Sequence, residues 1–163
     1  MKTLIIYSTK HGTTEKAVNI LKSKLTGEVH IVNIMLKPVT ALKEYDNIIL
    51  GGSIYVGKIQ KKLSSLINTN LPLLLEKRIG LFLCAAEKDE ALKEKEFKLA
   101  FPPTLFDQAI AKEVFGFELD MNKLSFFEKL IMSKVKGLKT SIYELSEEKI
   151  HAFAKSMAEG IKH

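Results

Sequence analysis

Short apolar runs separated by amphipathic segments most restrict the fold of this chain. The first run, Leu4-Ile5-Ile6-Tyr7, is continuously apolar, as expected for a strand covered on both faces. Similar runs occupy residues 29–32, 48–50 and 79–84, and Val114 to Leu119 is predicted to form a fifth strand. Because few polar side chains interrupt these runs, a parallel sheet buried between layers is favoured over a half-exposed antiparallel sheet.

Apolar residues recur at helical spacing between these runs. Stripes of this kind lie at 14–25, 59–67 and, more weakly, 91–101, where Pro102 and Pro103 end the pattern. A clear stripe at 150–161 follows Ser146, a good N-cap residue. Alternating strands and helices predict an α/β fold with an open, doubly wound, five-stranded parallel sheet and helices on both faces.

The length of 163 residues predicts a single domain over 1–163. The longest apolar stretch, Ile79 to Ala86, is eight residues, whereas a membrane-spanning helix needs about 20. The apolar block at 3–7 is too short for a signal peptide, so a cytoplasmic location is expected. The single cysteine, Cys84, is expected to be a buried residue without chemistry, and the four histidines show no metal-ligand spacing.

Charge is the feature of the composition that bears on partners. The 25 Lys and Arg residues against 19 Asp and Glu give a formal net charge of +6. Acidic partners and phosphate surfaces are therefore favoured. Arg78 is the only arginine, and because specific base readout relies largely on arginine, no nucleic-acid partner is expected.

The loop after the first strand predicts a phosphate site. In a doubly wound sheet, ligands bind at the carboxyl ends of the strands. Here the loop combines hydroxyl groups, a glycine and the amino end of a helix. It lacks the glycine spacing of ATP and dinucleotide loops, and a capping and turn segment is the alternative reading. Its residues are Ser8, Thr9, Lys10, His11, Gly12, Thr13 and Thr14.

Two further loops follow the third and fourth strands. In the second, an apolar and aromatic trio stands between Gly52 and Gly57, a pattern that suits a flat ring. The alternative is that Ile54 and Tyr55 pack on the next helix. The third, Ala85-Ala86-Glu87-Lys88, begins with two small residues that would let a ligand lie close.

Together the loops resemble those of the flavodoxin family. The likeness lies chiefly in residues 7–14 and in 45–53 leading into the second loop. It implies that FMN is the cofactor, with its phosphate on Ser8, Thr9, Gly12, Thr13 and Thr14. The ring would lie against Ser53, Ile54, Tyr55, Val56 and Gly57 and against the third loop, where Lys88 would favour the anionic reduced flavin. Lys10 and His11 replace smaller residues common in the family.

The second loop is more similar to the branch that includes the bacterial quinone-dependent protoporphyrinogen dehydrogenase. That branch also carries an insertion at the corresponding place, here at about 120–139. This segment combines an apolar stripe with five lysines and only one acidic residue, Glu128. The combination predicts a basic amphipathic helix. It would pack on the domain, contact an anionic membrane through 123–139, or meet an acidic protein or porphyrin. The stripe is Leu124, Phe127, Ile131, Val135 and Leu138, and the lysines are Lys123, Lys129, Lys134, Lys136 and Lys139.

The resemblance implies an FMN-dependent oxidoreductase that passes electrons from a reduced organic substrate, protoporphyrinogen-like, to a quinone or similar acceptor. The alternative is a soluble electron carrier that docks on redox proteins. If the insertion binds lipid, the location becomes peripheral on the inner face of the cell membrane. No catalytic residue is predicted, because the flavin carries the chemistry.

Overall fold

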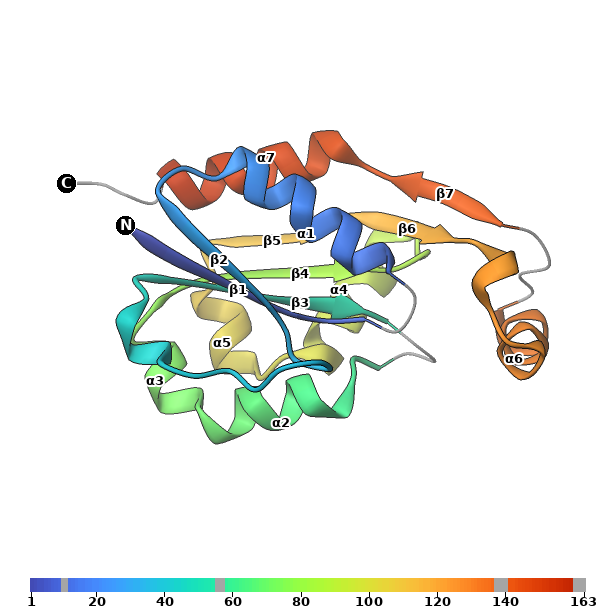
Figure 1. The fold of residues 1–163 in the computed structure, drawn as a ribbon, viewed down its shortest axis with the longest axis horizontal. Coiled ribbons are helices and arrows are strands. Elements are labelled where there is room, and N and C mark those ends of the chain that lie inside the picture. The colour runs from blue at the N-terminus through green and yellow to red at the C-terminus, as the bar shows by residue number, and fades with distance from the viewer. Residues whose placement is uncertain (10–11, 55–57, 137–140, 160–163) are drawn as a thin grey trace.

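The sheet has the predicted five parallel strands. The computed structural model describes residues 1–9, 12–54, 58–136 and 141–159 (Figure 1). The strand order is β2-β1-β3-β4-β5, so the chain runs to one side of β1 and then to the other. This confirms the doubly wound α/β fold. The strands are β1 (Lys2–Ser8), β2 (Glu28–Asn33), β3 (Asn47–Ser53), β4 (Arg78–Cys84) and β5 (Ala111–Val114).

Helices cover both faces of the sheet (Figure 1). One face carries α1 (Thr13–Lys24) and α7 (Glu147–Glu159), and the other carries α2 (Lys61–Thr69), α3 (Leu71–Leu75), α4 (Glu90–Ala100) and α5 (Pro103–Gln108). Two short 3-10 turns are η1 (Leu42–Glu44) and η2 (Met121–Lys123). None of the helices in the described ranges combines the length and apolarity needed to cross a bilayer.

Alternate residues of the central strands enter two separate hydrophobic cores. Leu4 and Ile6 pack towards α2 to α5, whereas Ile5 and Tyr7 pack towards α1 and α7. Three aromatic rings dominate the second core: Phe115 stacks on Phe82 at 4.9 Å between centroids, and Phe153 meets Phe115 edge-on at 5.3 Å. Burial on both faces accounts for the continuous apolar runs of the sequence.

The predicted fifth strand over Val114 to Leu119 is wrong as a single element. The chain leaves the sheet at Gly116, whose φ of +94° is a left-handed conformation that favours glycine. A Cβ there would collide with the carbonyl oxygen of Glu144. The residues after the break form β6 (Gly116–Leu119), which pairs antiparallel with β7 (Ile142–Leu145).

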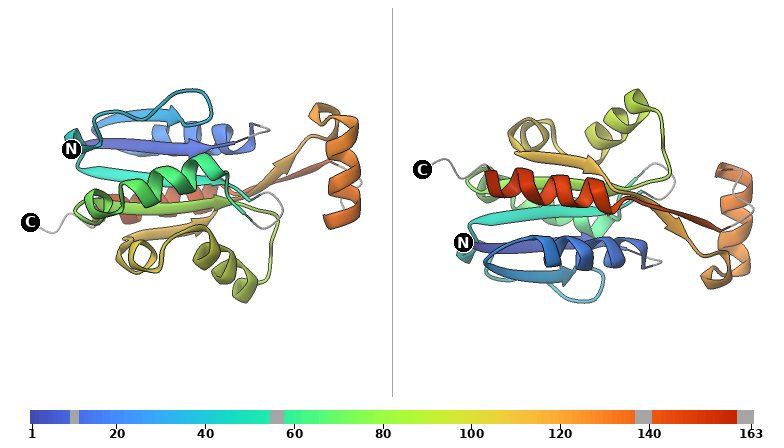
Figure 2. Two further views of the ribbon diagram at one scale, coloured as in Figure 1. Left: turned by 90° about the horizontal axis from the view of Figure 1, so that it is seen from below. Right: turned by 90° about the horizontal axis from the view of Figure 1, so that it is seen from above.

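The two-stranded ribbon β6–β7 projects beyond the sheet and carries α6 (Phe126–Lys136), and we call these elements the arm. Both views of Figure 2 place α6 at the far end of the arm, away from the body. Phe126 and Phe127 are 83% and 69% exposed, and Leu130 is also exposed. A helix, α6, lies within the predicted insertion, and of the predicted stripe Phe127 is exposed whereas Leu124, just before α6, is buried.

Candidate functional site

The three predicted loops start side by side at the carboxyl edge of the sheet. Ser8 at the end of β1 pairs with Gly52, and Ser53 at the end of β3 pairs with Cys84. The N–H of Ile54 donates to the Cys84 carbonyl at 3.0 Å. The strand order reverses between β1 and β3, and it is at this reversal that ligands bind in doubly wound sheets.

Two hydroxyl groups of the first loop have no hydrogen-bond partner among the described residues. The side-chain oxygens of Ser8 and Thr14 are buried and make no hydrogen bond. Buried polar groups are nearly always paired, so each such exception needs an explanation. These two groups flank the loop that leads into α1, where an anion would also meet the positive end of the helix. The residues present therefore fit a phosphate group.

The other hydroxyl groups of this loop, on Thr9 and Thr13, already make hydrogen bonds within the protein. The Thr9 hydroxyl accepts a hydrogen bond from the Gly12 N–H at 3.2 Å and so shapes the turn. The Thr13 hydroxyl donates to the Glu118 carbonyl on β6. Thr9 and Thr13 thus hold the loop and the arm in place. Lys10 and His11 lie outside the described residues.

The Lys16 ammonium ties the start of α1 to the arm. It lies 2.8 Å from the Glu118 carboxylate, and this hydrogen bond and ion pair raise the pKa of Lys16. Sequence analysis did not single out Glu118 or Glu144, which approach the site from the arm. No local pattern could have revealed them, because the antiparallel pairing of β6 with β7 brings them there.

In the second loop, close packing explains the glycine before Ser53. A Cβ on Gly52 would lie 2.6 Å from the Ser8 hydroxyl oxygen. Ile54 is only 3% exposed and belongs to the same core cluster as Leu63 of α2. This agrees with the alternative in which Ile54 packs on the next helix. Tyr55, Val56 and Gly57 lie outside the described residues.

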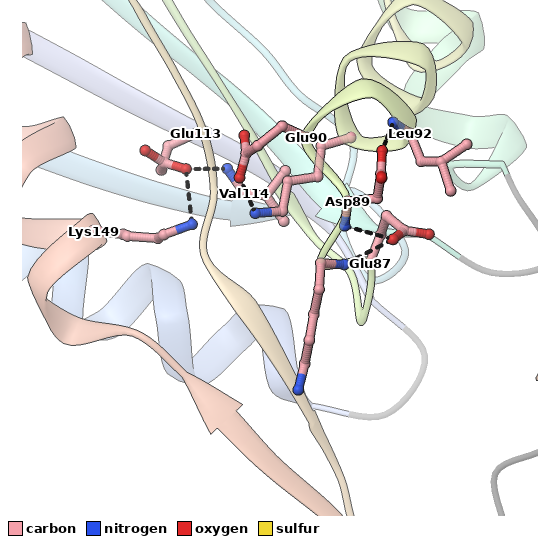
Figure 3. A network of polar contacts seen from close by, with 9 residues as sticks. Glu87, Asp89, Glu90, Leu92, Glu113, Val114 and Lys149 are labelled. Atoms are coloured by element: carbon pink, nitrogen blue, oxygen red, sulfur yellow. Dashed lines mark hydrogen bonds and ion pairs between the residues drawn. The ribbon is translucent and has the colours of Figure 1, made fainter.

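The third loop is a tightly bonded turn (Figure 3). The Glu87 carboxylate accepts hydrogen bonds from the N–H groups of Lys88 and Asp89, both at 2.8 Å. Asp89 in turn caps α4 by accepting from the Leu92 N–H at 3.0 Å. Buried Ala85 donates its N–H to the Gly116 carbonyl at 3.0 Å. Glu87 therefore shapes the backbone of this loop and is not poised as a base.

One salt bridge joins the third loop to the arm, and another beside it joins β5 to α7. The Lys88 ammonium lies 3.1 Å from the Glu144 carboxylate on β7, with both side chains exposed. This pairing offsets the charge that was expected to act on a reduced flavin. Glu113 of β5 accepts from the Val114 N–H at 2.9 Å and faces the Lys149 ammonium of α7 at 3.5 Å (Figure 3).

Cys84 is a buried thiol behind the site, as expected. Burial raises its pKa to about 12 and outweighs the nearby Thr14 hydroxyl, which lowers it. That contact lacks the geometry of a hydrogen bond, so the Thr14 hydroxyl still has no good partner. A thiol with so high a pKa is not a nucleophile near neutral pH. Within the described ranges, no group of three or more His, Cys, Asp or Glu residues could hold a metal ion.

Comparison with known proteins gives a match over almost the whole sequence. Residues 4–157 match the family model described as a flavodoxin domain. A search of curated proteins finds no match.

Solved structures share the fold at low sequence identity. Oxidised flavodoxin 1 from Bacillus cereus has a TM-score of 0.60 at 16% identity, with 99% of this chain and 100% of that chain covered. A short-chain flavodoxin associated with a PDU bacterial microcompartment has a TM-score of 0.63 with the same identity and coverage. A Fusobacterium nucleatum flavodoxin bound to flavin mononucleotide has a TM-score of 0.53 at 16% identity, again covering 99% and 100%. At this identity the likeness establishes the fold alone.

Proposed function

The chain belongs to the flavodoxin family, and we propose that it is a redox protein that binds FMN at the carboxyl edge of its sheet. The observation that carries the proposal is that the buried hydroxyl groups of Ser8 and Thr14 have no hydrogen-bond partner in the part of the chain that the structure describes. The structural neighbour with flavin mononucleotide bound adds support.

The residues have distinct parts in this proposal. Ser8 and Thr14 would donate to the phosphate, and Thr9, Gly12 and Thr13 would hold the loop around it, together with Lys10 and His11. The second and third loops, including Ser53 and residues 55–57 and 85–88, would enclose the ring and limit the access of water. When bound, FMN supplies reversible one- and two-electron transfer.

Two kinds of redox function fit this site. One is an oxidoreductase that takes electrons from a reduced organic substrate, protoporphyrinogen-like, and passes them to a quinone. The other is an electron carrier that docks on redox proteins, and it fits equally well, since the flavodoxins compared above match over their full length. The basic charge of +6 would steer this chain towards acidic partners.

The arm supports contact with an anionic membrane through residues 123–139. Exposed Phe126, Phe127 and Leu130 share one face of α6, and Lys134 lies on the same face. Aromatic and basic side chains on one short helix suit the interface between lipid headgroups and acyl chains. In this proposal, the protein works at the inner face of the cell membrane, where a quinone would be within reach.

Purification followed by a visible spectrum and cofactor release tests FMN binding. We expect a yellow protein that releases FMN, and a colourless protein that does not bind added FMN would contradict the proposal. Turnover with protoporphyrinogen and a quinone then separates the two functions. A carrier would give no turnover there, yet would pass electrons between a flavin reductase and a redox protein.

A further inference from the structure

A pocket lies between the turn after β2 and the start of α2, beside the strands that carry the proposed flavin site. Its volume is about 580 Å³. Ile34, Leu36 and Pro38 form its apolar wall, and Lys37, Lys61 and Lys62 stand around it. We call it the lysine pocket. Leu36 is 80% exposed.

Both walls of the lysine pocket are fixed to the strands that carry the flavin site. The Ile34 N–H donates to the Tyr7 carbonyl at 2.9 Å, which holds the turn against the end of β1. The N–H groups of Leu36 and Lys37 both donate to the Asn33 carbonyl at 3.0 Å. On the other wall, Leu63 of α2 packs beneath Gly52 of β3. The pocket is therefore a defined surface next to the carboxyl edge.

The charges around the pocket are all positive. The sequence has no Asp or Glu between Asp46 and Glu76. The structure gives Lys37, Lys61 and Lys62 no ion pair with any residue in its described ranges.

The positions of two of these lysines are unfavourable for the helix. Lys61 and Lys62 occupy the first turn of α2, which has no acidic residue, and the side chain of Gln60 makes no capping hydrogen bond. Lysines at this end of a helix oppose its dipole. A bound anion would offset the unfavourable interaction of these lysines with the helix dipole. It would also offset the repulsion among the three ammonium groups.

We propose that the lysine pocket binds a small amphipathic organic anion. Its apolar, aromatic body would lie on Ile34, Leu36 and Pro38, and its carboxylate or sulfonate would lie among the lysines. The volume falls within the range of roughly 300–1,000 Å³ typical of small-molecule sites, and a mostly apolar lining with a few charged groups is typical of them too. Binding of this anion does not depend on the proposed redox function. A role for the anion as electron donor or acceptor would rest on that function.

The test uses anilinonaphthalene sulfonate, a dye with an aromatic body and one negative charge. Titrations are read by dye fluorescence in full-length protein carrying Phe126→Ser and Phe127→Ser, which removes the two exposed aromatic rings of α6. The pocket variant is Lys37→Gln, Lys61→Gln and Lys62→Gln. The control, Lys22→Gln, Lys43→Gln and Lys95→Gln, removes the same charge from lysines outside the pocket.

We expect the pocket variant to bind the dye about tenfold more weakly, as the sum of three exposed charge interactions, and the control to change less than about twofold. Leu36→Ser should weaken binding of the dye and of neutral phenyl-naphthylamine alike. Equal dye affinity in the two triple variants, or neutral dye binding as tightly as the anionic dye, would overturn the proposal.

Competition identifies the occupant. Naphthalene carboxylate should displace the dye, and displacement by an acidic peptide alone would overturn the small-molecule assignment. FMN content, read by absorbance in the same samples, keeps the two proposals separate. Lysine-dependent dye binding without FMN would leave the pocket standing and reject the redox function. FMN binding together with dye binding that does not depend on the lysines would support the redox function and reject the lysine pocket.

Discussion

Replacing Thr14 with valine should affect the apoprotein and the cofactor complex in opposite directions. The Thr14 hydroxyl is buried and has no hydrogen-bond partner in residues 1–9, 12–54, 58–136 and 141–159, so the folded apoprotein bears the cost of removing it from water. Valine has nearly the same shape and no hydroxyl. Thr14→Val should therefore stabilise the apoprotein while removing a donor that FMN phosphate would use.

The two magnitudes can be worked out separately. An unsatisfied buried hydroxyl costs about 1–3 kcal/mol, and the nearby Cys84 thiol favours the lower end, so the free energy of unfolding should rise by about 1 kcal/mol. For a chain of this length, that corresponds to a Tm increase of roughly 2–4 °C. A hydrogen bond to a charged group is worth about 1.5–3 kcal/mol, so the FMN Kd should rise by roughly tenfold to a hundredfold.

Thr13→Val is the matched control. The Thr13 hydroxyl donates to the Glu118 carbonyl, so its loss should lower the free energy of unfolding by about 0.5–1.5 kcal/mol. Thermal unfolding of both apoproteins by circular dichroism and FMN titration by quenching of flavin fluorescence give the two readouts. A destabilised Thr14→Val apoprotein with unchanged FMN affinity would refute the reasoning.

Three further predictions concern the arm and the core. Phe126→Ser with Phe127→Ser should change the free energy of unfolding by less than about 0.5 kcal/mol, because both rings are exposed, yet should abolish co-sedimentation with anionic vesicles; retained pelleting would reject membrane contact through this face. Cys84, with its pKa raised to about 12 by burial, should resist iodoacetamide at pH 8 in the folded protein and react after unfolding in urea; rapid alkylation of the folded protein would show that the thiol is accessible. Gly51→Ala should cost about 1–3 kcal/mol in urea unfolding, because the added methyl group collides with the Phe82 ring; unchanged stability would mean that the ring can move aside.

The sheet could be predicted from the sequence because burial on both faces leaves a strong local signal. The run at 79–84 coincides almost completely with β4, and the run at 4–7 with the centre of β1. Pro102 was expected to end a helix, and α4 does end just before it. The start of α5 was not predicted, because in a sequence a proline at the first position of a helix, such as Pro103, cannot be told from a proline that ends a helix.

The arm and part of the site depend on contacts that no local pattern encodes. The break at Gly116 lies inside one apolar run, and only the pairing of β6 with β7 shows why the chain turns there. Ser8 and Thr14 were predicted as phosphate-binding residues from their residue types. The hydrogen bond from the Thr13 hydroxyl to the Glu118 carbonyl could not be predicted, since the two residues are 105 positions apart.

The projection of the arm has a consequence for how the molecule opens. A two-stranded ribbon is at best marginally stable by itself, whereas the central strands are enclosed by two cores. Amide hydrogens of β6 and β7 should therefore exchange with solvent through local opening, long before those of β1 and β3, which require global unfolding. The arm is in this sense a module whose tip sequence can change with little effect on the folding of the body. Natural variation and engineering can thus change what the tip of the arm binds while the sheet and its loops stay the same.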